Sequence, residues 1–422
     1  MNKEHFSVYN HSLVYGNNQI AVRKFIVLEH TDGTKTFTDF HRYSANPNRK
    51  IKSFNSDGDK RCTYICKLLN YAFFSVGISS LSELTVAIGQ EFLQSYAMCQ
   101  LPEDDDYTRR SESTIKLCVD YILDFYTNLI LDKHSGCNIR PDELYRTVSA
   151  RNRYGKVVRK KVPLFDVSFS PSYKAPIFRD MPNKAFHLLF DHIVMHHKDI
   201  LGLVLNQAFA GLRPSEACNV RRPDSPLGAG IIFSEINGEL YKIEIDLRNE
   251  LNLRSDLINV GGIKRERMAR VPDIFLSAYK ETYDIYADYM KDKVYERDYG
   301  ALSVNKQGKT ITYQSYYNKF RDIINEIIPI YLDHEDPELV LYGQTLMTHS
   351  LSPHVFRHWY TVQLVLSGID NPGVLMHFRG DRSPESSAVY IQSKGDLEKQ
   401  FSRINNETFD YIRWAAKKEH DA

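Results

Sequence analysis

The sequence predicts a mainly α-helical protein with a small antiparallel sheet, an α+β fold. Apolar residues recur at three- and four-residue spacing over most of the chain, which indicates amphipathic helices. Two short stretches instead have the signature of a β-hairpin. With 422 residues, 42% hydrophobic and 25% charged, the chain is long enough for two or three globular domains with separate cores.

The first 48 residues predict a β-containing extension. Residues 20–40, "IAVRKFIVLEHTDGTKTFTDF", alternate in polarity and contain Asp32-Gly33, a dipeptide that favours a hairpin turn. We expect this extension, residues 1–48, to be an arm-type or accessory element.

A helical domain is expected over residues 49–150. The segments "YICKLLNYAFFSVGI", "LSELTVAIGQEFLQSYAMC" and "STIKLCVDYILDFYTNLIL" each have a helical apolar period, and the acidic stretch "PEDDDYTRRSES" separates the last two.

The stretch from residue 140 to 179 is strongly basic. It holds ten lysines and arginines against three acidic residues, although the whole chain has a net charge of only +1. A solvated charged connector is one interpretation, but the charge density and the interleaved tyrosines favour a segment that follows a nucleic-acid backbone. We predict a linker over 151–178 without a clear period, whose DNA contacts come from Arg151, Arg153, Lys156, Arg159, Lys160 and Lys161.

A larger domain is predicted over residues 179–422. Helices are expected at "NKAFHLLFDHIVMHH" and "DILGLVLNQAFAG", the second ended by Gly211. A hairpin turns at Asn237-Gly238, and a third strand follows around "RMARVPDI". Further helices are expected over 274–292, 313–331, 353–366, 372–379 and 384–392, and again near the C-terminus.

Several classes of protein and site are disfavoured. No apolar run approaches the roughly 20 residues that span a bilayer, and the N-terminus lacks an apolar signal segment. The six cysteines have no zinc-binding spacing, so we expect reduced thiols in a cytoplasmic protein. His192 and His196 have a metal-like i, i+4 spacing, but no third ligand is evident, and we interpret them as helix-surface or core residues; we expect no metal and no cofactor.

Three short motifs carry the functional prediction. "GLRPSE" places Arg213 before Pro214 at a helix start, where free backbone N–H groups also favour anions. "HVFRHWYTVQL" places His354 and Arg357 on one helix face. "SPESSAVY" begins another helix and presents Tyr390. Separately, each motif has an ordinary structural explanation, such as an ion pair between Arg213 and Glu216.

In this order and spacing, the motifs resemble the tyrosine recombinase/integrase family over about residues 180–395. The preceding helical domain looks like that family's core-binding domain. The resemblance implies Tyr390 as nucleophile, Arg213 and Arg357 as phosphate clamps, and His354 in acid–base work. It also implies a lysine on a sheet turn, which "GGIKRERMARVP" supplies as Lys264; the neighbouring Arg265 and Arg267 are alternatives.

One position departs from the family pattern. Nine residues before the nucleophile most members carry histidine or tryptophan, whereas this chain has Asp381. An ionised aspartate cannot donate a hydrogen bond to a phosphate oxygen. We therefore predict that Asp381 orients a cationic group of the site.

The chemistry explains this choice of residues. Two arginines stabilise the charge that develops on the phosphodiester, and a cationic pocket lets tyrosine, with an unperturbed pKa of about 10, act as a nucleophile. The resemblance implies a 3′-phosphotyrosyl intermediate, with Lys264 as the acid for the leaving 5′ oxygen. Because that link keeps the bond energy, neither ATP nor Mg²⁺ is expected, and the sequence contains no P-loop.

The expected partner is a double-stranded DNA recombination site, with a dimer on each site, a tetramer in the synapse and accessory DNA-bending or directionality proteins. The expected role is integration or excision of a mobile element or phage in the bacterial cytoplasm, at the nucleoid. A type IB topoisomerase, a telomere resolvase and a catalytically idle DNA-binding member remain alternatives. Tyr360 is a second candidate nucleophile, although its apolar helix favours a core position.

Overall fold

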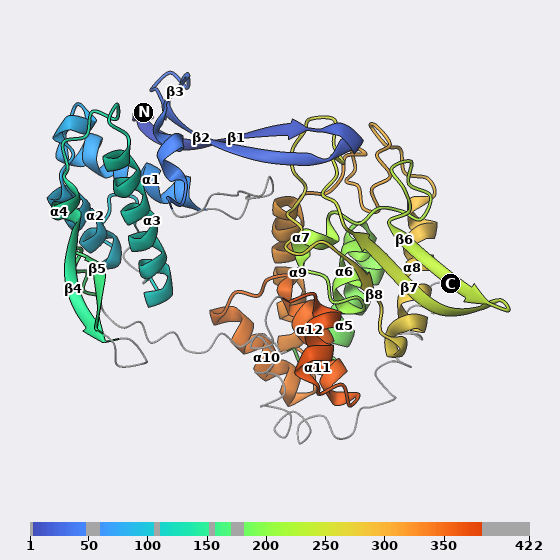
Figure 1. Ribbon diagram of the computed structural model, residues 1–422. Coiled ribbons are helices and arrows are strands. Elements are labelled where there is room, and N and C mark those ends of the chain that lie inside the picture. The colour runs from blue at the N-terminus through green and yellow to red at the C-terminus, as the bar shows by residue number, and fades with distance from the viewer. Residues whose placement is uncertain (1–2, 48–59, 105–109, 152–156, 170–180, 382–422) are drawn as a thin grey trace. The chain divides into compact units, whose positions relative to one another are not determined.

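The computed structural model describes residues 3–47, 60–104, 110–151, 157–169 and 181–381 (Figure 1). The chain divides into two compact units. Unit 1 consists of Met1–Leu13 and Val22–Ala175, and unit 2 of Val14–Ala21 and Pro176–Ala422. Helices combine with three small sheets, so the predicted α+β class is confirmed. No helix in the described part of the chain is long and apolar enough to cross a membrane.

Unit 1 combines a three-stranded sheet with a group of helices. The sheet has the order β1-β2-β3, formed by His5–Val14, Ile20–Glu29 and Lys35–Phe37. The helices are α1 (Arg61–Asn70), α2 (Val86–Ala97), α3 (Glu112–Leu131) and the short α4 (Pro141–Leu144). The predicted turn at Asp32-Gly33 joins β2 to β3, and Gly33 has the positive φ of 83° that favours glycine.

The sheet and the helices of unit 1 share one core. Phe6 and Ile26 come from the strands, and Leu68, Phe92 and Ile122 come from the three long helices; all five are buried in the same cluster. The sequence predicted a separate extension over residues 1–48. In the structure, β1 and β2 instead share a core with the helices of unit 1. The β1–β2 connection with the adjoining strand ends, Val14–Ala21, groups with unit 2, where Gln19 forms a β-bridge with Leu251.

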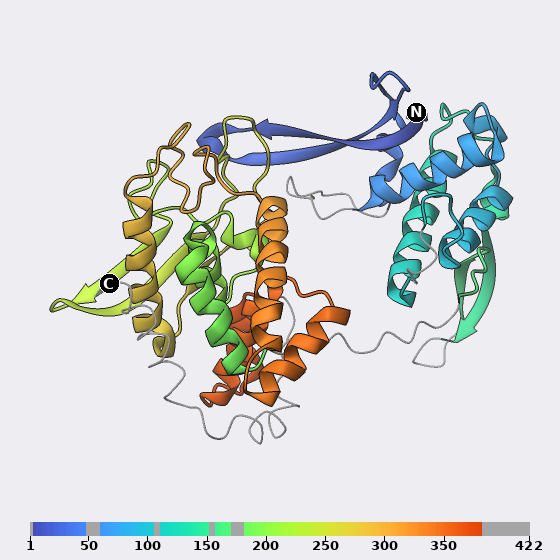
Figure 2. The same cartoon turned by 180° about the vertical axis from the view of Figure 1, so that it is seen from behind.

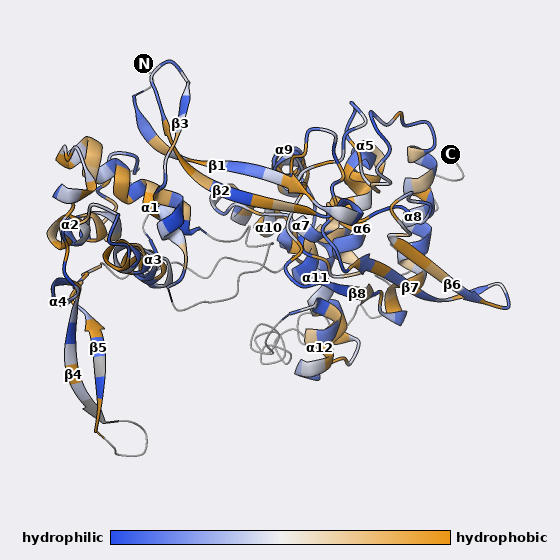
Figure 3. Ribbon diagram, turned by 45° about the horizontal axis from the view of Figure 1, so that its top comes forward, coloured by the Kyte–Doolittle hydropathy of each residue, from blue (hydrophilic) through white to orange (hydrophobic). Residues whose placement is uncertain are grey.

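The basic stretch contains regular structure that the sequence analysis missed. Strand β4 (Tyr145–Arg151) pairs antiparallel with β5 (Val157–Pro163), so the prediction of an irregular linker over 151–178 is wrong for its first part. In Figure 3 the hydrophilic middle of β5 lies between hydrophobic ends. The valines at these ends have high strand propensity, but the run of three basic residues between them hides the two-residue alternation.

Unit 2 consists mainly of helices with one antiparallel sheet, as predicted (Figures 1 and 2). The helices are α5 (Asn183–His196), α6 (Leu201–Ala208), α7 (Pro214–Ala217), α8 (Leu276–Met290), α9 (Tyr313–Leu332), α10 (Pro337–Thr348), α11 (His354–Leu366) and α12 (Pro372–Arg379). The sheet has the order β6-β7-β8, formed by Ile231–Ile236, Glu239–Leu247 and Arg267–Arg270. Helix α10 was not predicted.

The core of unit 2 surrounds α6, whose eight residues are all buried. Helix α11 packs against it and buries ten of its own thirteen residues, among them Trp359, whose ring stacks on Phe186 at 3.8 Å. Because α11 is enclosed on nearly all sides, even its charged Arg357 is buried. This enclosure positions the candidate site.

Candidate active site

The segment that joins α6 to α7 brings Arg213 to the start of a helix. Gly211 has a φ of 64°, and a Cβ there would lie 2.3 Å from the ring of Tyr360, so only glycine fits without strain. The chain then turns, and Arg213 precedes Pro214 as predicted. The Arg213 side chain donates from Nη1 to Glu216 at 3.0 Å and from Nη2 to Asp381 at 2.5 Å.

Arg357 reaches the same place from α11. Its Nη2 donates to Asp381 Oδ1 at 2.8 Å, and its Nη1 donates to the backbone carbonyls of Gly211 and Arg379. Burial lowers the pKa of Arg357 to about 9, with repulsion from the neighbouring arginines adding to the shift and Asp381 opposing it. The guanidinium is still charged at neutral pH, but it depends on its anionic neighbours.

The backbone after α12 holds Asp381 in place. Gly380 adopts a φ of 62°, and the N–H of Asp381 donates to the carbonyl of Met376 at 3.1 Å, which closes the helix end. A side chain at position 380 would also meet Arg267, since a Cβ there would lie 2.3 Å from Nε. Gly380 therefore allows a guanidinium to approach the chain directly beside Asp381.

The Asp381 carboxylate is a point of convergence. Its Oδ1 accepts from Arg213 and Arg357, and its Oδ2 accepts from Arg379 Nε at 2.6 Å. Burial raises the pKa of this carboxyl, but the charges of Arg357 and Arg379 lower it by more, so it stays ionised. The predicted contact between Asp381 and a cationic group is present; its catalytic role remains a prediction.

A second carboxylate, Glu216, shares Arg213 with Asp381. It is completely buried and accepts from Arg213 and from both terminal nitrogens of Arg267, at 3.2 and 3.0 Å. Arg265 donates to the backbone carbonyl of Asp381 at 2.6 Å. Arg265 and Arg267 therefore both belong to the cluster. Lys264 and Arg265 are exposed, whereas Arg267 is half-buried.

The cluster has an excess of positive charge. Among the described residues, two carboxylates, Glu216 and Asp381, gather five guanidinium groups around them, those of Arg213, Arg265, Arg267, Arg357 and Arg379. The buried Nε of Arg267 has no hydrogen-bond partner among the described residues. Arg357 and Arg379 are buried and the other three guanidiniums are half-buried or exposed, an arrangement that suits an anionic ligand at the surface of the cluster.

Of the other candidate catalytic residues, the structure describes His354 and Tyr360. His354 is the first residue of α11, one turn before Arg357, and its side chain is exposed. Tyr390 lies outside the described residues. Tyr360 is fully buried against Phe275, and burial raises the pKa of its hydroxyl, which is the environment of a core residue and not of a nucleophile.

The predicted DNA-binding residues lie at the β4–β5 hairpin. Arg159 and Lys161 are exposed on β5. Arg151 and Lys160 belong to the two strands, but their side chains are not described, and Arg153 and Lys156 lie outside the described residues.

Sequence reasoning missed Arg379 and treated Arg265 and Arg267 only as alternatives to Lys264. The available signal was the pattern "FRGD", where an arginine, a glycine and an aspartate end a helix. A C-terminal arginine is common in helices because it complements the helix dipole, so this pattern does not by itself indicate a site.

Comparisons with known proteins give structural likenesses only. No protein-family model matches the chain, and no curated protein matches it. The chain is similar to the XerH site-specific recombinase bound to palindromic difH substrate, with 14% identity, a TM-score of 0.43 and coverage of 82% of this chain and 77% of that one. It is also similar to the Tn1549 transposon integrase in complex with transposon right end DNA, with 14% identity, a TM-score of 0.45 and coverage of 83% and 94%. It is similar to the XerA recombinase as well, with 14% identity, a TM-score of 0.31 and coverage of 88% of this chain and 93% of that one. We base the proposed function on this chain's own residues.

Proposed function

We propose that this protein is a tyrosine-type site-specific DNA recombinase, which cleaves and rejoins DNA through a 3′-phosphotyrosyl intermediate. One observation carries the proposal. Arg213 and Arg357, 144 positions apart in the sequence, direct their Nη2 atoms at the same carboxylate oxygen of Asp381. Two guanidinium forks that converge on one oxygen are arranged to hold a single tetrahedral anion such as a phosphodiester.

The charge balance favours a reaction without a metal ion at the scissile phosphate. Pentacovalent phosphorus carries extra negative charge on its non-bridging oxygens, and preorganised positive groups in a buried site stabilise that charge strongly. Here five guanidiniums gather around two carboxylates within the described part of the chain, and the hydrogen bonds to Glu216 and Asp381 hold guanidiniums in position before DNA arrives. Tyr390 supplies the attacking oxygen, His354 assists proton transfer, and Lys264 protonates the leaving 5′ oxygen.

The partner in this proposal is duplex DNA carrying a recombination site. Exposed basic residues on β5 would contact the phosphate backbone and position the protein without reading sequence. Integration or excision of a mobile element is the role we favour, with two copies on each site and four in the synapse.

Covalent trapping tests the proposal. Nicked duplexes made from the DNA that flanks the gene are incubated with the full chain without added metal or nucleotide, and denaturing gels reveal a protein–DNA adduct. Wild type should form the adduct, whereas Arg357→Ala should form it about 10²–10³-fold more slowly, as expected for loss of one charge-stabilising donor. Arg270→Ala is the matched control, because this arginine lies on β8 but pairs with Asp273.

Two results would redirect the assignment. DNA binding without any adduct across all the flanking sequences would indicate the catalytically idle alternative. Relaxation of supercoiled plasmid without strand exchange between two sites would indicate a topoisomerase.

A further inference from the structure

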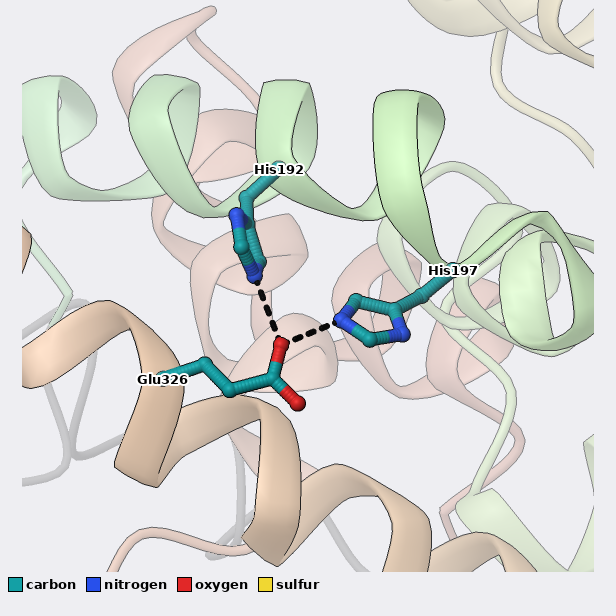
Figure 4. A group of neighbouring side chains, drawn as sticks. All are labelled: His192, His197 and Glu326. Carbon is teal, nitrogen blue, oxygen red and sulfur yellow. Dashed lines mark hydrogen bonds and ion pairs between the residues drawn. The ribbon is translucent and has the colours of Figure 1, made fainter.

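A group of potential metal ligands lies on elements that supply none of the five site arginines. His192 from α5, His197 directly after α5 and Glu326 from α9 turn their polar atoms toward one point (Figure 4). The two Nε2 atoms and one carboxylate oxygen all lie within 4.8 Å of one another. This convergence depends on two segments separated by more than a hundred residues.

The end of α5 creates the arrangement. On a continuous α-helix, residues five apart point about 140° away from each other, so His192 and His197 would not share a face. The helix ends at His196, and His197 leaves the helical path with φ −135° and ψ 43°. This departure brings the centroids of the two rings to 5.1 Å. The i, i+4 partner His196 remains exposed and is not part of the group.

The contacts as they stand are those of an ion pair, and a small ion would need only slightly more room between the three groups. Glu326 Oε2 lies 3.1 Å from His192 Nε2 and 2.6 Å from His197 Nε2, so one oxygen serves both rings. Tetrahedral zinc, with bonds of about 2.0–2.2 Å to nitrogen and oxygen, separates its ligand atoms by about 3.3 Å. An outward shift of the carboxylate by less than about 1 Å would make room for the ion at that bond length.

The exposure of the three side chains allows the carboxylate, and not the imidazoles, to make this shift. The side chains of His192 and His197 are 14% and 9% exposed, whereas that of Glu326 is 48% exposed. The imidazoles are held by packing, and the carboxylate is able to change rotamer at the surface. The exposed side also leaves a position for water to complete the coordination.

We propose that His192, His197 and Glu326 form a binding site for one divalent transition-metal ion, with Zn²⁺ as the expected occupant, which links the end of α5 to α9. Two imidazoles and one carboxylate are a ligand set that zinc accepts, with water in the fourth position. The site is separate from the proposed strand-transfer chemistry and does not depend on it.

Metal binding to the full chain tests the proposal. Protein freed of metal by chelation and gel filtration is titrated with ZnCl₂ by calorimetry, with thermal unfolding followed in parallel. We expect one ion per chain and a higher unfolding temperature with zinc. Glu326→Gln keeps the shape and a hydrogen-bond acceptor but loses the anionic ligand. It should bind zinc at least about tenfold more weakly, because even the loss of a residue that only hydrogen-bonds to a metal ligand lowers metal affinity about tenfold or more.

His196→Ala is the matched control, because it removes an exposed histidine from the same helix turn and should leave zinc affinity unchanged. Co²⁺ serves as a second probe. At this site it should show d–d absorption without the thiolate charge-transfer bands expected at cysteine. The absence of binding by wild type, equal affinity of Glu326→Gln and wild type, or a thiolate signal would each overturn the proposal.

Discussion

Replacing Asp381 by alanine should destabilise unit 2 strongly. The carboxylate is only 5% exposed and accepts from Arg213, Arg357 and Arg379 at 2.5–2.8 Å. Removing one partner of a buried ion pair leaves the others uncompensated, at a cost of about 3–5 kcal/mol. Arg357 is the most affected, because it is 4% exposed and its pKa is already lowered by burial.

Urea unfolding followed by tryptophan fluorescence measures this loss. Trp359 is buried in the core of unit 2, stacked on Phe186, and therefore reports on this unit. Asp381→Asn keeps the shape and one acceptor oxygen, so we expect a smaller loss of about 1.5–3 kcal/mol, the value of hydrogen bonds to charged groups. Millimolar phosphate should recover part of the stability of Asp381→Ala by replacing the missing anion, and should affect wild type less.

The stability advantage of wild type over Asp381→Asn should become smaller as pH falls. The charges of Arg357 and Arg379 hold the pKa of Asp381 in the folded state below its ordinary value of 3.8, although burial opposes this, so the unfolded chain takes up a proton first as pH falls. The contribution of the carboxylate is therefore complete above about pH 5 and declines as pH falls through the lowered pKa. Glu216 is present in both proteins and cancels in the comparison.

Single-turnover cleavage adds a functional measurement. Looser arginine geometry in Asp381→Ala should slow cleavage about tenfold, equivalent to about 1.4 kcal/mol. Asp381→His also removes the carboxylate that accepts from Arg213, Arg357 and Arg379, so it should destabilise unit 2 as alanine does. If Asp381→Ala unfolds at the wild-type urea concentration and cleaves at the wild-type rate, the carboxylate holds nothing in place and the reasoning fails.

Three further predictions concern the nucleophile, the basic hairpin and a glycine. Tyr390→Phe should abolish the covalent adduct and keep DNA binding, measured by gel shift; persistent adduct would move the nucleophile elsewhere. Alanine at the four basic positions Lys156, Arg159, Lys160 and Lys161 should weaken DNA binding equally across sequences and lower its salt dependence. Unchanged affinity and an unchanged salt slope would make this segment a solvated connector. Gly211→Ala should cost about 2–4 kcal/mol of unfolding free energy through the clash with Tyr360 and the positive φ. The control Gly368→Ala, at φ 94° with open space around it, should cost only about 1 kcal/mol. Equal losses in the two variants would contradict the role of Tyr360.

Elements with a clear apolar period were predictable from the sequence. The helices α5, α9, α11 and α12 and the hairpin turn at Asn237-Gly238 lie where the pattern places them. Helix α10 and strands β4 and β5 were missed. In β5 the basic run interrupts the alternation, and pairing with β4 supplies the hydrogen bonds that local propensity does not reveal.

The sequence by itself determined the fold class, because helix and strand patterns and helix ends have local signals in the residues that form them. It singled out Arg213, Arg357 and Asp381 through the resemblance of its motifs to those of the tyrosine recombinase family. Only the tertiary structure decided which charges meet. Arg265, Arg267 and Arg379 join the cluster through contacts with Glu216 and Asp381, and Glu326 meets two histidines more than a hundred residues away. Such contacts depend on how α7, α9, α11 and α12 pack around α6, and packing between distant segments leaves no local pattern in the chain.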